Sequence, residues 1–285
     1  MKKKILSFAL AGVLSALALT GCGSSGESAS DTNASNDELT TITVAATAAP
    51  HAEILESEVV TNTLADKGYK LEVTVFQDYV QPNNVVESGE IDANYFQHIT
   101  YLNDFNEENG TSLVSAGGIH YEPFGIYAGT KDSLDDIAAG DSIAIPNDTT
   151  NEARALLLLQ DNGLITLEDG VGLTATVNNI VDNPYNLDIV EIEAAQVPHQ
   201  LESVSYAVMN GNYAMEAGYS VATDALSYES QTSEAAENYV NVIAVKEGNE
   251  TNEGIVALVE VLKSDEVKEY IEEEYDGSVV PYEGE

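Results

Sequence analysis

The sequence predicts a mixed α/β fold, and three observations support this. From Ile42 onward, short apolar runs alternate with stretches of helical period, which is typical of α/β units around mainly parallel sheets. Glycines and an Asn-Gly pair stand where these runs end, as expected at helix stops and turns. The chain has 285 residues, 44% of them hydrophobic, so it is long enough for one large or two medium domains with buried cores.

In the first part of the chain, Gly68 is expected to end a helix in the left-handed conformation. Asp78 and Gln81 form a D-x-x-Q helix start, and Gly89 ends that helix. The elements expected here are strands at 41–46, 71–76, 111–117 and 123–129, a brief strand or turn at 90–96, and helices at 52–65, 81–89 and 97–108.

The same alternation restarts after a polar stretch near residue 131. The elements expected here are strands at 141–146, 187–194, 204–209 and 239–248, a helix at 149–160, a short helix after Asn210-Gly211, and two helices from about residue 252. We expect a first lobe of residues 42–128 with 241–285 and a second lobe of residues 129–240. No repeat of fixed period is present.

The N-terminus has the anatomy of a secretory signal peptide at 1–21, with three lysines before an apolar run and small residues before Cys22. That run is short for a membrane span, so an uncleaved anchor is the weaker interpretation. The residues LTGC resemble the lipobox of bacterial lipoproteins, in which the cysteine is acylated (palmitate); an incidental free thiol is the alternative. Residues 22–41 are rich in Ser, Asn, Asp and Gly, which predicts a disordered tether.

The charge of the chain excludes some classes of partner. With 49 acidic residues against 10 Lys and Arg, the formal charge is -39, and no basic patch for nucleic acid can be assembled. Cys22 is the sole cysteine, so the chain forms no internal disulfide. Arg154 is the sole arginine, which makes its position informative.

Arg154 lies in the first turns of the helix expected at 149–160. The residues TTNE at 149–152 fit a capping box, in which the side chain of Thr149 accepts from the backbone amide of Glu152 and the side chain of Glu152 accepts from the backbone amide of Thr149. This helix start lies at the carboxyl edge of the preceding strand, where open α/β sheets bind ligands. Asn151 and Arg154 share one face, so they could converge with the helix amides on a carboxylate. The alternative is a surface arginine paired with Glu152 or Asp148.

Two other groups suggest a ligand pocket. Asn210 follows a strand, and its side-chain carbonyl could accept from an ammonium group; the alternative is an ordinary Asn-Gly turn. Aromatic residues concentrate in one region, where most should be core and about a third could line a pocket for an apolar or thioether side chain. They are Phe76, Tyr79, Tyr95, Phe96, Tyr101, Tyr121, Phe124 and Tyr127.

The histidines and Glu122 allow a metal hypothesis. The four histidines are His51, His98, His120 and His199. No pair has the HExxH or C-x-x-C spacing of a strong zinc motif, so we expect no metal site. Walker, G-x-S-x-G and G-x-G-x-x-G motifs are also missing, and we expect neither enzyme activity nor a cofactor.

Five ordered stretches resemble the methionine-binding lipoproteins of ABC importers, the NlpA type. They are PHAEILE, DANYFQHITYL, GIHYEPFGIYAG, IAIPNDTTNEARALLLLQDNGLI and VMNGNYAMEAG. The resemblance implies a type II periplasmic-binding-protein fold, with two α/β lobes joined by two crossing strands. It implies that Arg154, with Asn151 beside it, holds the ligand carboxylate and that Asn210 holds the ammonium group. It also implies that Phe96, His98, Tyr101 and His120 surround the ligand side chain.

The resemblance further implies a protein anchored by lipid on the extracytoplasmic face of the cell membrane, delivering L-methionine to a permease and its ATPase. D-methionine and methionine-containing dipeptides are alternative ligands. The chain departs from the family by Ala153 where a glycine is usual, and by SVSYAVMN, which lacks the acidic residue often found before the asparagine. The alternative function is a zinc- or manganese-capturing lipoprotein that uses His98, His120 and acidic partners. We expect replacement of Arg154 to leave folding nearly unchanged.

Overall fold

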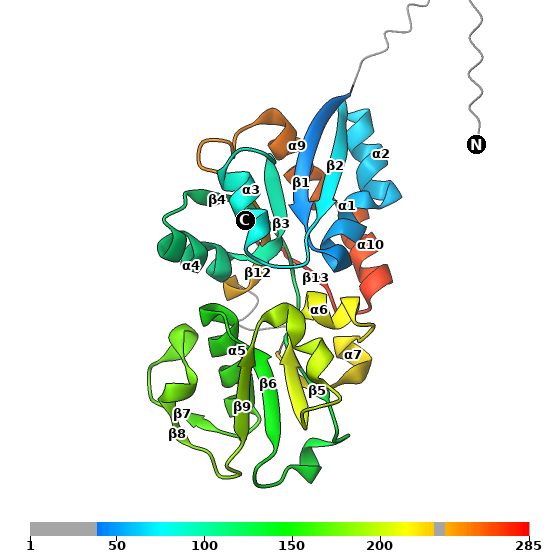
Figure 1. Ribbon diagram of the computed structural model, residues 1–285. Coiled ribbons are helices and arrows are strands. Elements are labelled where there is room, and N and C mark those ends of the chain that lie inside the picture. Colours follow the sequence, from blue (N-terminus) through cyan, green and yellow to red (C-terminus); the bar gives the residue numbers. More distant parts are fainter. Residues whose placement is uncertain (1–38, 231–236, 285) are drawn as a thin grey trace, which may run out of the picture. The chain divides into compact units, whose positions relative to one another are not determined.

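A computed structural model of the protein describes residues 39–230 and 237–284 (Figure 1). The predicted signal peptide, Cys22 and almost all of the predicted tether lie outside the described residues. The first strand begins at Thr40, so the last two residues of the stretch predicted as tether belong to a strand.

A six-stranded sheet forms the centre of the first lobe, in the order β13-β4-β12-β3-β1-β2 (Figure 1). β1 runs parallel to both β2 and β3, whereas β12 is antiparallel to β3 and β4. The strands are β1 (Thr40–Ala46), β2 (Tyr69–Val75), β3 (Ala93–His98), β4 (Leu113–Tyr121), β12 (Val240–Lys246) and β13 (Val280–Pro281).

Helices cover this sheet and are capped by the residue types that helix ends prefer. Ser57 and Ser264 accept from amides at the starts of α2 and α10, and Gly110 ends α4 with a φ of 66°. The core between sheet and helices contains Val44, Leu64 and Leu258, all fully buried. The helices are α1 (Glu53–Glu56), α2 (Glu58–Asp66), α3 (Gln81–Glu87), α4 (Ile99–Asn109), α9 (Glu253–Leu262) and α10 (Asp265–Tyr275), and an irregular turn (Ala48–Ala52) precedes α1.

A five-stranded sheet in the order β11-β5-β10-β6-β9 forms the centre of the second lobe. β6 is parallel to β9 and β10, whereas β5 is antiparallel to β10 and β11. Its strands are β5 (Gly125–Ala128), β6 (Ser142–Pro146), β9 (Asp188–Ile192), β10 (Tyr206–Met209) and β11 (Ala225–Tyr228), beside a small hairpin of β7 (Thr166–Leu167) and β8 (Ile180–Asp182).

The main helix of the second lobe, α5 (Thr149–Asp161), buries its apolar run, including Leu156 and Leu159, against this sheet. The α-helices α6 (Gly211–Glu216) and α7 (Val221–Asp224) accompany it. Short 3-10 helices span Leu134–Asp136, Gly172–Thr174, Val177–Asn179, Ala194–Gln196 and Pro198–Gln200.

The chain crosses between the two sheets twice, between β4 and β5 and between β11 and β12. We call residues 122–124 the first connection, and the described residues 229–230 and 237–239 the second connection. The first crossing precedes β5, so β5 belongs to the second sheet and the expected boundary at residue 128 falls a few residues too late. The mixed α/β class, the helix expected at 149–160 and the two final helices are confirmed; β7, β8, β11 and β13 were not predicted.

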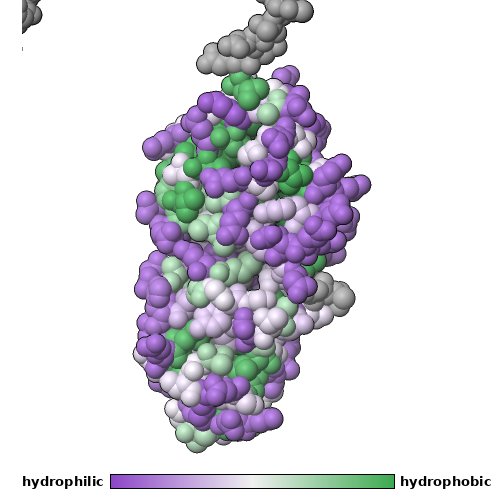
Figure 2. All heavy atoms as spheres, turned by 90° about the vertical axis from the view of Figure 1, so that its right-hand side faces the viewer, coloured by the Kyte–Doolittle hydropathy of each residue, from purple (hydrophilic) through white to green (hydrophobic). Residues whose placement is uncertain are grey.

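The face shown in Figure 2 is mainly hydrophilic, with apolar residues in scattered patches. This agrees with the formal charge of -39, because charged residues are almost never fully buried unless they are paired. Within the described residues, no helix is long and apolar enough to cross a membrane.

The packing of α5 can be tested with two neighbouring leucines. Leu156→Ala is expected to lower the free energy of unfolding by about 2–5 kcal/mol, the usual cost for a buried leucine, because Leu156 is fully buried. Leu157 is only partly buried, so Leu157→Ala should cost clearly less. Urea unfolding followed by circular dichroism measures both, and equal losses would show that α5 packs through a different face.

Candidate functional site

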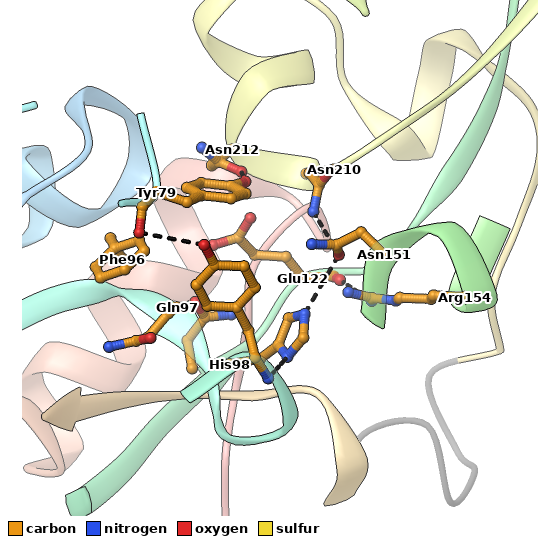
Figure 3. Close-up of a pocket in the computed structure, with 12 residues that line it drawn as sticks. Tyr79, Phe96, Gln97, His98, Glu122, Asn151, Arg154, Asn210 and Asn212 are labelled. Atoms are coloured by element: carbon orange, nitrogen blue, oxygen red, sulfur yellow. Dashed lines mark hydrogen bonds between the residues drawn. The ribbon is translucent and has the colours of Figure 1, made fainter. Parts of the chain in front are cut away.

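A small cavity lies between the two lobes (Figure 3). The lining residues are Tyr79, Phe96, Gln97, His98, Tyr101, Glu122, Asn151, Arg154, Asn210, Gly211, Asn212 and Asn241. Six of the seven residues expected at the site therefore line one cavity; the seventh, His120, does not.

Junctions between strands and helices supply most of this lining. His98 stands between β3 and α4, and Asn210 stands between β10 and α6. Asn151 and Arg154 lie in the first turns of α5, which follows β6. Carboxyl ends of strands are where open α/β sheets bind ligands, so the topology brings polar side chains from both lobes to one place.

Asp148, rather than Thr149, caps α5. Its carboxylate accepts from the backbone amide of Asn151 at 3.1 Å and from the Asn151 side-chain amide at 2.8 Å. Glu152 accepts from the amide of Val177 at 2.8 Å, and the Thr149 hydroxyl donates to Glu108 at 3.4 Å. The predicted capping box is therefore wrong, because Asp148, one residue earlier and a better cap than threonine, takes the position.

Asn151 orients the side chains around it. Its Oδ1 accepts from Asn210 Nδ2 at 2.9 Å and from His98 Nε2 at 3.3 Å, while its Nδ2 donates to Asp148. This leaves Asn210 Oδ1 buried and, among the described residues, without a hydrogen-bond partner. An unpaired buried carbonyl is costly unless a donor arrives, so Asn210 is positioned to accept from a ligand.

His98 is a neutral link between the lobes. Its Nδ1 accepts from the amide of Tyr101 at 3.0 Å, so the proton is on Nε2, which donates to Asn151. Burial, followed by the charge of Arg154, lowers the pKa of His98 to about 3. The ring therefore contributes a hydrogen bond and no charge at neutral pH.

Arg154 is almost fully buried and holds a carboxylate from its own chain. Nε and Nη2 donate to the two carboxylate oxygens of Glu229 at 2.8 Å and 2.6 Å, and Nη2 also donates to the carbonyl of Glu122 at 2.8 Å. The hydroxyl of Tyr121 and the backbone amide of Phe124 both donate to Glu229 Oε2. The alternative of a surface arginine paired with Glu152 or Asp148 is therefore wrong.

Aromatic rings enclose the guanidinium of Arg154. Its central carbon lies 4.1 Å from the ring centre of Tyr239 and 4.6 Å from that of Phe124, at cation–π distance. Burial disfavours the charged form, but the Glu229 carboxylate outweighs it and raises the pKa of Arg154 above its ordinary value. Arg154 thus remains charged, and its bonds to Glu229 and to the carbonyl of Glu122 come from Nε and Nη2.

Three aromatic side chains line the cavity: Tyr79, Phe96 and Tyr101. Tyr79 stacks on Tyr213 with ring centres 4.9 Å apart, and its hydroxyl donates to Asn212 Oδ1 at 2.5 Å, which again joins the two lobes. Tyr95, Tyr121, Phe124 and Tyr127, also in the predicted aromatic group, are nearly fully buried and do not line the cavity.

His120 lies behind Glu122, which separates it from the cavity. Its Nε2 contacts Glu122 Oε1 at 2.7 Å and its Nδ1 contacts the hydroxyl of Tyr95. His51 approaches the same Glu122 oxygen at 3.3 Å. Among the described residues, the group close enough to hold a metal ion is His51, His120 and Glu122. A metal site that combines His98 with His120 is therefore not supported.

Several lining residues were not among the expected site residues. Asn212 and Gly211 belong to the NGNYA stretch that drew attention to Asn210, and Glu122 had been considered only as a metal ligand. Gln97 and Asn241 had no signal of their own, because their positions depend on strand pairing between β3 and β12.

Two α/β lobes that enclose a small polar and aromatic cavity define a substrate-binding protein of the periplasmic-binding-protein type. The chain belongs to the NlpA lipoprotein family, whose model matches residues 42–283. The resemblance noted from the sequence is thereby confirmed.

Individual relatives are similar over nearly their whole length. The methionine-binding lipoprotein MetQ of Bacillus subtilis (strain 168) is 39% identical over 289 residues, which cover 99% of each chain. A Ruminococcus gnavus protein of known crystal structure is 70% identical, with a TM-score of 0.84 over 86% of this chain and 100% of that chain. A Burkholderia cenocepacia nutrient binding protein, solved bound to methionine, is 41% identical, with a TM-score of 0.79 over 84% of this chain and 99% of that chain.

The contacts of Arg154 change the expectation that its replacement leaves folding nearly unchanged. Arg154→Ala should lower the free energy of unfolding by about 3–5 kcal/mol, because the largely buried Glu229 side chain, 11% exposed, loses its partner. The control is Lys67→Ala, which breaks an exposed pair with Glu260 and should cost no more than about 1 kcal/mol. Urea unfolding measures both, and a small, equal loss would contradict a structural role for Arg154.

Stability should fall as the pH decreases from about 6.5 toward about 4. Burial lowers the pKa of His51 to about 4 and those of His98 and His120 to about 3, against 6.5 in the unfolded chain. Above pH 6.5 these histidines are neutral in both the folded and the unfolded protein. Below pH 6.5 they are protonated in the unfolded chain before they are protonated in the folded protein. The free energy of unfolding therefore falls by up to about 1.4 kcal/mol per pH unit for each histidine. Burial raises the pKa of Glu122, which offsets part of this loss.

Urea titrations across this pH range test the effect. His98→Asn keeps a side chain that can cap α4 but cannot titrate, so its stability should depend on pH less steeply than that of the wild type. The exposed His199→Asn is the control and should follow the wild-type curve. An unchanged slope in His98→Asn would show that His98 is protonated in the folded protein.

Proposed function

We propose that this protein is the substrate-binding lipoprotein of an ABC importer, that it is acylated at Cys22, and that it captures methionine between its two lobes. The observation that carries the proposal is the composition of the cavity wall. Arg154 lines this cavity together with Asn210 and Asn212, whose Oδ1 and Nδ2 atoms have no hydrogen-bond partner among the described residues. A donor for a carboxylate and an acceptor for an ammonium group together fit the backbone of an amino acid.

The aromatic side of the cavity supports a thioether side chain. Tyr79, Phe96 and Tyr101 lie around it within 6.2 Å of one another, ring centre to ring centre. Sulfur makes favourable contacts with aromatic rings at about 5 Å. The names of the relatives point the same way, since one is called methionine-binding and another was solved with methionine bound.

The groups along the cavity match a single amino acid, because Arg154 can attract a carboxylate, Asn210 can accept from an ammonium group, and Tyr79, Phe96 and Tyr101 form one aromatic wall. We therefore place L-methionine first, with D-methionine and methionine-containing dipeptides as alternatives. On this proposal the lipid anchor keeps the protein on the extracytoplasmic face of the cell membrane. It changes no bond in its ligand and passes methionine to a permease whose ATPase supplies the energy.

Isothermal titration calorimetry tests the ligand directly. The protein should first be unfolded and refolded to remove any bound ligand, and then titrated with L-methionine, D-methionine, Gly-Met and the other common amino acids. We expect heat with L-methionine at 1:1 stoichiometry. An absence of heat with methionine and its peptides, together with stoichiometric binding of zinc or manganese, would favour the metal-capturing alternative.

Side-chain replacements test the roles of Asn210 and Arg154. Asn210→Ala should weaken methionine binding about 10- to 150-fold, the effect of losing one hydrogen bond to a charged group. Arg154→Lys should also bind more weakly, because a single ammonium cannot replace the forked guanidinium. The control is Asn162→Ala, whose side chain bonds to Leu158 at the far end of α5. Wild-type affinity in Asn210→Ala would remove Asn210 from the site.

A further inference from the structure

We infer that the carboxylate of Glu122 is the counterion of the ligand's ammonium group and makes the cavity selective for ligands with a free amino group. This inference rests on the proposed function and adds an anionic group to it. Figure 3 shows Glu122 between Tyr79 on one side and Asn151 on the other, inside the ring of residues that line the cavity.

A glycine beside Glu122 leaves room for the carboxylate. Glu122 lies in the first connection and is only 5% exposed. A Cβ atom on Gly211, at the start of α6, would come within 2.8 Å of Glu122 Oε2 and of Glu122 Cβ. Any other residue at 211 would displace Glu122, so the backbone of α6 is shaped around this side chain.

Two imidazoles contact one oxygen of Glu122 without neutralising it. His120 Nε2 lies 2.7 Å and His51 Nε2 lies 3.3 Å from Oε1. The opposite nitrogens contact the hydroxyls of Tyr95 and Thr47, which fixes both rings. Burial lowers the pKa of His51 to about 4 and that of His120 to about 3, so neither imidazole carries a charge at neutral pH. His120 holds the oxygen by a hydrogen bond, whereas the hydrogen bond of His51 Nε2 goes to Asn241 Oδ1.

The carboxylate itself lacks a direct cationic partner among the described residues. Arg154, whose charge acts on Glu122, donates to the backbone carbonyl of Glu122 and directs its paired donors to Glu229. Burial accordingly raises the pKa of Glu122. A buried carboxylate costs several kcal/mol unless a cation approaches it, so a cationic ligand group would be drawn to this position.

A second acceptor faces the same cavity. Asn210 Oδ1 is buried and has no hydrogen-bond partner among the described residues. An ammonium group has three donors and no acceptor, so a carboxylate and an amide carbonyl together complement it. The Arg154 guanidinium lines the same cavity, and its positive charge would attract the carboxylate of the same ligand and so orient an α-amino acid between opposite charges.

A divalent cation between His51, His120 and Glu122 is the competing explanation, because their ligand atoms lie within 4.8 Å of one another. Both imidazoles, however, already bond to protein groups through each ring nitrogen, including His51 Nε2 to Asn241 Oδ1 at 3.1 Å. A metal there would also leave Asn210 Oδ1 unpaired. The ammonium accounts for both observations.

The test compares L-methionine with 4-(methylthio)butanoate, which lacks only the amino group. Calorimetry on the refolded wild type should show L-methionine binding about 10- to 150-fold more tightly, as expected for charge-assisted hydrogen bonds. Glu122→Gln should lose most of this preference by weakening L-methionine, while the affinity for the analogue stays the same or rises. Glu152→Gln is the matched control, since Glu152 is also buried but bonds to Val177, and it should keep the wild-type preference.

The outcomes separate the inference from the proposed function. If the wild type binds neither compound, the proposed function fails. If it binds both equally, or if Glu122→Gln keeps the wild-type preference, methionine binding stands and the role of Glu122 is wrong. Should Glu122→Gln fail to fold, the preference for L-methionine over the analogue is compared between the wild type and Glu122→Asp, and that comparison decides the role of Glu122. Stoichiometric zinc binding that is lost in both Glu122→Gln and His120→Gln would overturn the inference in favour of a metal site.

Discussion

Both connections between the lobes meet at the guanidinium of Arg154, which reaches them from α5. It bonds to Glu229 in the second connection and to the carbonyl of Glu122 in the first. Separating these groups would leave a buried charge without its partner, so the connections and the start of α5 are positioned together. The cavity depends on this junction, because α5 and the first connection supply part of its wall.

Hydrogen bonds among the side chains of the cavity wall determine which of its polar atoms are left to contact a ligand. Asp148 takes the side-chain amide of Asn151, and Asn151 in turn accepts from Asn210 and His98. The consequence is that the carbonyl of Asn210 remains without a partner among the described residues. Neutral histidines contribute donors without charge, so the charged groups at and beside the cavity include Arg154, Glu229, Glu122 and Asp148. The selectivity of such a site depends on the few atoms that the fold leaves unpaired.

Much of the fold and part of the site could be predicted from local patterns. The strand before α5, the helix itself and the turn at Asn210 follow from apolar period and turn residues over a few positions. Phe96, His98 and Tyr101 were placed at the cavity through motifs that match a family. The cap of α5 was misassigned by one residue, because the capping-box pattern favoured Thr149 although Asp148 is the better cap. Strand β11 and the exact lobe boundary at β5 depend on pairing partners far along the chain.

The sequence by itself determined the α/β class, the family and the importance of its sole arginine, since these depend on composition, period and short motifs. Only the tertiary structure decided what Arg154 contacts, because Glu229 is 75 residues away and no local pattern connects them. It likewise placed His120 behind Glu122 and Glu122 at the cavity, through the packing of α6 against the first connection. Contacts between distant segments follow from how the sheets and connections pack together, and a single sequence carries no local signal for them.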